Sequence, residues 1–279
     1  MATFLTPIKI QIEYIDKQSY GANINTMLNK PIIKYITITI NDKNVEDFLR
    51  LASSGQFNTA TNTIEIYSYK LDPNFSPAHL NNIKEMIKIL ADAKKYTINH
   101  EMRHWHNHKT LGDYGDFAQH NYFQETSLYY LDEISAFSAG ILYSDKTLLQ
   151  FGTTPESIIA ALQCGTDEFM HPETFGFYLS DITDHVTEYI LDDLHNNDIT
   201  LNKLKRQYHT SLTALDRLFS KRFHRAAKYL LTFDNQYVLN KKKLPPHAMD
   251  ALQDVKSKLE QIKYLFLTKL QCRLHEIIY

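Results

Sequence analysis

Two histidines and a glutamate occur at a spacing that suits metal-assisted hydrolysis. The run His100-Glu101-Met102-Arg103-His104 matches the pattern H-E-x-x-H. In a helix, the two histidines of this pattern project from one face, one turn apart, so one metal ion can bind both rings. The glutamate then lies beside the metal and can take a proton from water, whose pKa zinc lowers towards neutrality. The run therefore predicts a zinc site at His100 and His104, with Glu101 as general base.

A third ligand must come from elsewhere, because catalytic zinc takes three protein ligands and leaves one position for water. Asp132 and Glu133 are adjacent carboxylates in an apolar segment, where a charge without compensation is costly. Glu133 lies 29 residues after His104, which is enough for a loop and a returning helix. Asp113 and Asp116 are the alternatives, in a glycine-containing stretch typical of a solvated turn. We expect Glu133 to be the third ligand.

A strand, a helix with H-E-x-x-H and a following helix with an acidic residue resemble the gluzincins, the thermolysin-like zinc peptidases. The resemblance covers roughly residues 57–137, and only the five-residue motif is specific. It implies that the two histidines and Glu133 bind zinc and that Glu101 is the general base. It also implies that the strand before the active-site helix, here 63–69, binds substrate as an added strand.

The sequence departs from the gluzincin pattern beside the third ligand. That pattern has Asn before the ligand glutamate and Asp four residues after it, whereas this chain has Asp132 and Phe137. Asp132 or another residue must therefore orient the zinc-bound histidine. The third histidine of a metzincin would fall at Thr110, which disfavours that class. The residue that stabilises the oxyanion stays open among His171, His185 and several tyrosines.

Hydrophobic periodicity predicts strands at 32–40 and 63–69, a short helix at 45–52, and longer helices over about 76–108 and 125–144. The strands are rich in β-branched residues that alternate with other types. Ser76-Pro77 supplies a helix N-cap followed by proline at the first helical position. The H-E-x-x-H run falls inside the first long helix, which neither Gly nor Pro interrupts before Gly112.

The rest of the chain is predicted to be helical, over about 155–163, 176–195, 201–232 and 248–277. Gly and Pro are scarce, with eight of each, which disfavours an all-β fold with many tight turns. We expect an α+β fold that is mostly α-helical, with a small N-terminal sheet. Residues 1–150 would form a zincin-like catalytic domain, and 151–279 a helical domain or extension.

Charge is distributed unevenly along the chain, although the net charge is only −2. Residues 101–200 hold 17 acidic and three basic residues, whereas residues 201–279 hold six acidic and 16 basic residues. The basic residues alternate with apolar ones at helical spacing, so we interpret them as packed or solvated helix faces. Nucleic acid is therefore not the expected partner, and the acidic region would favour basic peptides.

The N-terminal residues lack the charged and apolar regions of a signal peptide, and no stretch approaches about 18 consecutive apolar residues. The two cysteines, Cys164 and Cys272, are too far apart in sequence to form a metal-binding pair. We expect a cytoplasmic protein without a membrane segment, while secretion by a route without a cleaved signal stays open.

The expected function is zinc-dependent hydrolysis of peptide bonds in a peptide or protein substrate. One alternative is a module that binds nucleic acid through residues 201–279 and has a structural or vestigial metal site. Another is a partner-binding helical protein in which H-E-x-x-H occurs by accident. These hypotheses differ in whether the purified protein holds a metal, and in whether His104 is needed for it.

Overall fold

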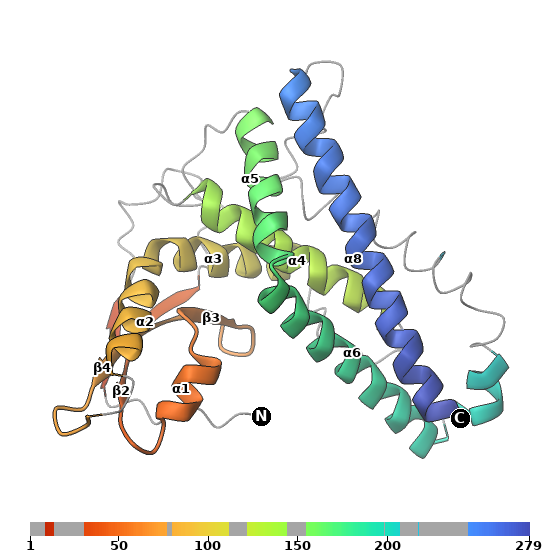
Figure 1. The fold of residues 1–279 in the computed structure, drawn as a ribbon, viewed down its shortest axis with the longest axis horizontal. Coiled ribbons are helices and arrows are strands. Elements are labelled where there is room, and N and C mark those ends of the chain that lie inside the picture. The colour runs from red at the N-terminus through yellow and green to blue at the C-terminus, as the bar shows by residue number, and fades with distance from the viewer. Residues whose placement is uncertain are drawn as a thin grey trace. The chain divides into compact units, whose positions relative to one another are not determined.

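The computed structural model describes residues 9–13, 31–76, 80–111, 122–143, 155–197, 199–206, 217 and 245–279. The fold is α+β and mostly α-helical, with a small N-terminal sheet and a helical C-terminal half, as predicted (Figure 1). The chain forms two compact units: Met1–Gly112 with Ala139–Gly152, and Asp113–Ser138 with Thr153–Tyr279. Residues 113–138, which we placed in a catalytic domain of residues 1–150, are thus grouped with the second unit.

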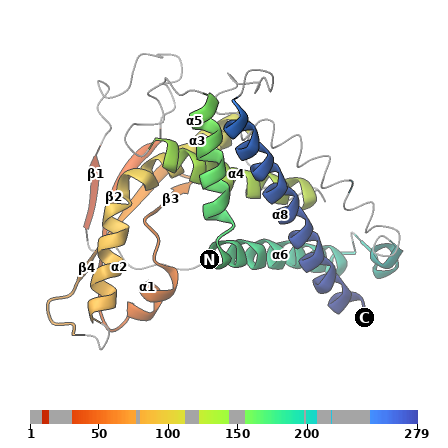
Figure 2. The same cartoon turned by 45° about the horizontal axis from the view of Figure 1, so that its top comes forward.

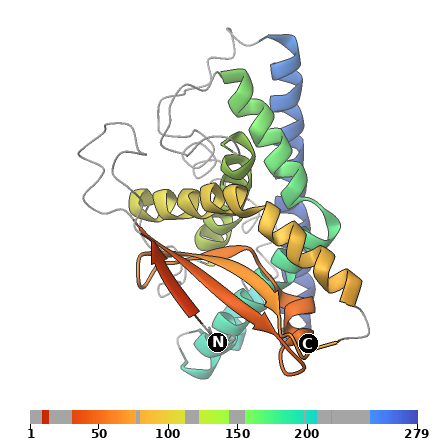
Figure 3. The same cartoon turned by 90° about the vertical axis from the view of Figure 1, so that its left-hand side faces the viewer.

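The first unit contains a four-stranded sheet in the order β1-β2-β4-β3 (Figure 3). At its centre, β2 (Ile32–Ile40) pairs in parallel with β4 (Thr63–Leu71). At its edges, β1 (Lys9–Glu13) and β3 (Gly55–Asn58) pair antiparallel with β2 and β4. The two central strands confirm the predicted ones, whereas the sequence did not lead us to expect β1 and β3.

Helices of the first unit cover this sheet. Ile40 of β2, Phe48 of α1 (Val45–Leu51) and Ile83 of α2 (Leu80–Asp92) form one buried cluster. The ring of Phe48 also meets that of Tyr69 on β4 edge to face, with centroids 4.9 Å apart. The short predicted helix at 45–52 is therefore confirmed. It lies in the connection between the parallel strands β2 and β4.

The prediction of one long helix from about residue 76 to about 108 is wrong. The chain forms α2 and then α3 (Lys94–Leu111), with a turn at Ala93, and the two helices point in different directions (Figure 3). Hydrogen bonds from Ala93 N to Ile89 O and from Thr97 N to Ala93 O bridge the break. A straight helix of that length would extend about 48 Å, whereas strands of nine residues extend about 30 Å. The bend allows both helices to stay on the sheet. Pro77, the expected first helical residue, lies outside the described residues.

The second unit is built from helices. These are most of α4 (Tyr122–Leu142), α5 (Pro155–Phe169), α6 (Pro172–His195) and α8 (Pro246–Ile278). Both α5 and α6 pack along α8, as Figures 1 and 2 show. The apolar stripe predicted on α8 is buried, including Leu252, Leu259 and Phe266. Residues 201–206 are also helical, and the rest of the predicted helix 201–232 lies outside the described residues, apart from residue 217.

Basic residues of α8 form ion pairs with acidic residues. Lys258 pairs with Asp167 on α5 and with Asp254 on its own helix. Arg273 lies 3.2 Å from Asp184 on α6. These contacts agree with the interpretation that the basic C-terminal segment packs beside the acidic part of the chain. In the part of the chain that the structure describes, no helix is long and apolar enough to cross a membrane.

Candidate metal centre

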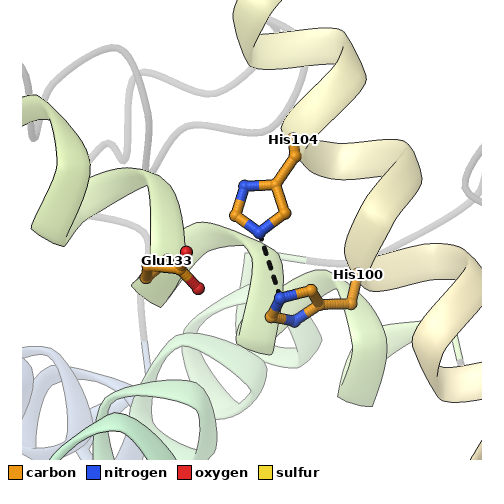
Figure 4. Close-up of side chains that lie close together, drawn as sticks. All are labelled: His100, His104 and Glu133. Carbon is orange, nitrogen blue, oxygen red and sulfur yellow. Dashed lines mark hydrogen bonds between the residues drawn. The ribbon is translucent and has the colours of Figure 1, made fainter. Parts of the chain in front are cut away.

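Helix α3 carries the H-E-x-x-H run and orients its histidines as the spacing predicts. The Nε2 atoms of His100 and His104 point towards one another and lie 3.0 Å apart (Figure 4). Two nitrogen ligands of a tetrahedral zinc, each about 2.0–2.1 Å from the ion, are about 3.3 Å apart. The spacing of the two nitrogens therefore suits a pair of ligands of one ion, and it equally suits a hydrogen bond between neutral imidazoles.

His100 is held in the form that can bind a metal. Burial lowers the pKa of His100 well below its ordinary value of 6.5, and the neighbouring His104 lowers it further. The ring is consequently neutral at neutral pH, and neutral imidazole is the form that coordinates metal ions.

Glu133 on α4 joins the two histidines. One ligand atom from each of His100, His104 and Glu133 lies within 4.8 Å of the others (Figure 4). Zinc ligands lie somewhat closer, about 3.3 Å apart, so the side chains would draw together on binding. Glu133 is only 7% exposed, as expected for a charge that needs a partner. The structure thus brings together the three residues proposed as ligands from the sequence.

The end of α4 is fixed on α3 inside the first unit. A Cβ added to Gly140 would lie 2.6 Å from Cε2 of Tyr96, so only a glycine allows this approach. Asn99 Nδ2 donates a hydrogen bond of 2.5 Å to the carbonyl oxygen of Tyr143. Gly140 follows Glu133 by seven residues, two turns along the same face of one helix. Gly140 and Asn99 therefore hold the C-terminal end of α4 against α3.

A tyrosine from α6 contacts the carboxylate of Glu133. The Tyr178 hydroxyl donates a hydrogen bond of 3.1 Å to Glu133 Oε2. The Tyr178 ring stacks on Phe169, with centroids 5.3 Å apart, and meets Tyr129 edge to face. Burial, followed by the charge of Glu133, raises the pKa of Tyr129 well above its ordinary value of 10.0. Sequence reasoning had left the tyrosines undistinguished, because no local pattern links α6 to Glu133.

Glu101 follows the first histidine on a part of α3 that contacts the sheet. Thr97 Oγ1 donates a hydrogen bond of 2.6 Å to Ser54 Oγ, and the centroids of the His108 and Phe57 rings are 5.8 Å apart. Glu101 stands one turn after Thr97, is 6% exposed, and its charge is among those that raise the pKa of Tyr67 on β4. The carboxylate therefore lies where α3 passes the sheet.

The expectation that residues 63–69 accept a substrate as an added strand is wrong for the first part of this strand. β3 already pairs with residues 63–66, and Tyr67 N donates to Ser54 O, so that edge of β4 is occupied. On its other side, β4 pairs with β2 along its whole length. In the sheet that the structure describes, β3 is the outer strand next to α3.

The other residues singled out in the sequence have separate environments. Asp132 is buried, and its role in orienting a ligand stays a prediction. Asp113 and Asp116 lie outside the described residues. His171 is exposed just before α6, and the exposed His185 lies 3.6 Å from the Asp181 carboxylate.

Comparisons with family models, with curated proteins and with solved structures find no match to this chain. The resemblance to gluzincins stays a prediction, and the case for a function depends on the residues and their geometry.

Proposed function

We propose that this protein is a zinc-dependent hydrolase of peptide bonds. The observation that carries the proposal is the convergence of ligand atoms from His100, His104 and Glu133 within 4.8 Å. Two imidazoles and one carboxylate are a donor set that suits catalytic zinc and leaves a position for water. The H-E-x-x-H spacing adds a carboxylate next to the first ligand, which a purely structural site does not need.

In the proposed reaction, some residues would bind the ion and another would transfer the proton. His100, His104 and Glu133 would hold the ion, which supplies a Lewis acid and a lowered pKa for the attacking water. Glu101 would accept the proton of that water and deliver it to the nitrogen of the departing amine. Burial of Glu101 supports this role, because a carboxylate removed from bulk water exchanges protons with the reacting groups instead of with solvent.

The outer edge of β3 supports an extended peptide as substrate. Unpaired backbone groups at a sheet edge can bind a peptide as an additional strand. Ser54, directly before β3, contacts Thr97 of α3, and Phe57 within β3 contacts His108. Glu101 lies in the part of the helix between these two contacts. The substrate strand that we expected at 63–69 is accordingly reassigned to residues 55–58.

Metal analysis tests the proposal directly. Purified wild-type protein is expected to hold about one zinc ion per chain. Both His100→Ala and His104→Ala should lose it, because each removes one of three ligands. His185→Ala is a matched control, since His185 is exposed on α6 and contacts Asp181. Equal metal content in the wild type and the His104 variant would contradict the proposal and favour an accidental motif.

A further inference from the structure

We propose that Tyr178 positions Glu133 for metal binding through its hydroxyl group. The inference rests on the proposed metal site and adds to it a residue that is not itself a ligand. Its basis is the 3.1 Å hydrogen bond from Tyr178 Oη to Glu133 Oε2, which joins α6 to α4 across 45 residues of sequence. Both residues belong to the second unit.

The hydrogen bond assigns different tasks to the two oxygens of Glu133. Oε2 accepts the phenolic proton, and Oε1 is assigned to the ion. A carboxylate that can rotate would lose conformational entropy on binding, whereas one whose second oxygen is already held loses less. The hydroxyl also compensates part of the cost of keeping this charge buried in an apolar helix.

The packing of the Tyr178 ring fixes the direction of the hydroxyl. Its face stacks on Phe169, which is fully buried, at an interplanar angle of 25°. Phe169 in turn meets Tyr130 of α4 edge to face, with centroids 5.9 Å apart. Tyr129 closes another side of the ring, 6.0 Å away. A hydroxyl on a ring held by α4 and α5 is positioned before any metal arrives.

The test is the zinc affinity of the full chain, measured by competition with a chelator of known affinity. Partners that orient a metal ligand typically contribute about 10–100-fold to metal affinity. Tyr178→Phe removes only the hydroxyl and keeps the stacking ring, so it should weaken zinc binding by about this factor. Tyr129→Phe is the matched control, because it removes the hydroxyl of the neighbouring tyrosine and keeps its ring against that of Tyr178. This control should keep the wild-type affinity.

A double-mutant cycle separates positioning from a general effect on the fold. In a Glu133→Ala background, Tyr178→Phe should change zinc affinity no further, because the proposed effect of Tyr178 on the ion passes through the Glu133 carboxylate. A loss of the same size in that background, or wild-type affinity in Tyr178→Phe, would overturn the inference. Unfolding temperatures without metal, measured for every variant, should be slightly lower for Tyr178→Phe than for Tyr129→Phe, because the buried Glu133 carboxylate loses a donor. A complete loss of folding confined to Tyr178→Phe would assign the residue to folding instead.

The proposed function and this inference fail in distinguishable ways. A wild-type protein that binds no zinc, or binds it independently of His104, contradicts the metal site itself. A wild-type protein whose zinc depends on His104 but not on the Tyr178 hydroxyl keeps the metal site and overturns only the positioning role.

Discussion

Glu101 and Glu133 are both buried carboxylates, 6% and 7% exposed, yet the proposed site gives them different tasks. Glu133 groups with the histidines and accepts a hydrogen bond from Tyr178. Glu101 lies one residue after the first ligand, on the part of α3 that passes the sheet. In the proposal, the place of each carboxylate relative to the histidine pair separates a ligand from a proton acceptor, since their chemical groups are identical.

Replacing Glu101 by Gln should separate metal binding from catalysis. The amide keeps the shape of the carboxylate but cannot accept a proton, so hydrolysis should fall by about 10²–10⁴-fold while zinc content stays at the wild-type level. Cleavage of a broad peptide library, with zinc measured on the same samples, provides the readout. A Glu101→Gln protein as active as the wild type would rule out Glu101 as the base.

The third ligand can be tested against its alternatives. Glu133→Ala should weaken zinc binding by orders of magnitude, because it removes the only carboxylate that the structure groups with the histidines among the described residues. Asp113→Ala and Asp116→Ala should bind zinc as the wild type does. If an aspartate variant loses zinc while Glu133→Ala keeps it, the assignment of Glu133 is wrong, although zinc hydrolysis could still occur.

At the scale of elements, the site depends on how closely α3 and α4 approach. Gly140 lies against the Tyr96 ring, one turn before His100 on α3, while Glu133 lies two turns before Gly140 on α4. Gly55 plays a similar part at the start of β3. A Cβ there would lie 2.6 Å from the Glu65 carbonyl oxygen and 2.8 Å from Thr97 Cγ2. Two glycines thus set the distances of α3 from α4 and from the sheet.

We expect Gly140→Ala to weaken zinc binding although Gly140 contacts no ligand. The added methyl must displace the Tyr96 ring or move the helices apart, which should lower the free energy of unfolding by about 1–3 kcal/mol. Gly176→Ala is the matched control, because nothing lies within 4 Å of a Cβ at this helical position. Alanine there should raise stability by about 0.5–1 kcal/mol and leave zinc affinity unchanged. Denaturant unfolding and chelator competition measure both effects, and unchanged zinc affinity in Gly140→Ala would refute the proposed dependence on helix spacing.

Some elements were predictable from sequence because their signals are local. The alternation of residues 32–40 and the i,i+4 histidines each describe one strand or helix by itself, and both predictions hold in the structure. β3 has only four residues, including Gly55 and Asn58, and it becomes a strand because β4 pairs with it. The turn at Ala93 likewise has no Gly or Pro near it that would predict a break between helices.

The residues of the candidate site also differ in whether a local sequence signal predicts them. Glu133 was predictable because a charge in an apolar helix needs a partner, which is a property of one segment. Tyr178 was not, because its hydrogen bond joins residues 45 positions apart and depends on the packing of α6. Long-range partners of this kind leave no periodic pattern in the sequence.

At the scale of the whole molecule, a bound metal should stabilise the fold. The proposed ligands come from α3 and α4, and an unfolded chain would not hold them together. Zinc at about 100 times its dissociation constant would add about 2.7 kcal/mol to the free energy of unfolding. For a chain of this size that should raise Tm by about 5 °C.

Differential scanning calorimetry with zinc and with excess chelator measures this shift. The wild type should show it reversibly, whereas His104→Ala should have the same Tm under both conditions. An equal rise in the His104 variant would place the stabilising zinc at another part of the molecule.

The first unit is assembled from two separate stretches of chain, Met1–Gly112 and Ala139–Gly152. During translation, the sheet strands and both histidines emerge from the ribosome well before Gly140 and Tyr143, which fix α4 on α3. A nascent chain that stops short of residue 139 therefore has the histidine pair but no anchored Glu133. The proposed enzyme would therefore acquire its ion, and with it the ability to cut peptides, only after residues 139–143 have been made and packed on α3.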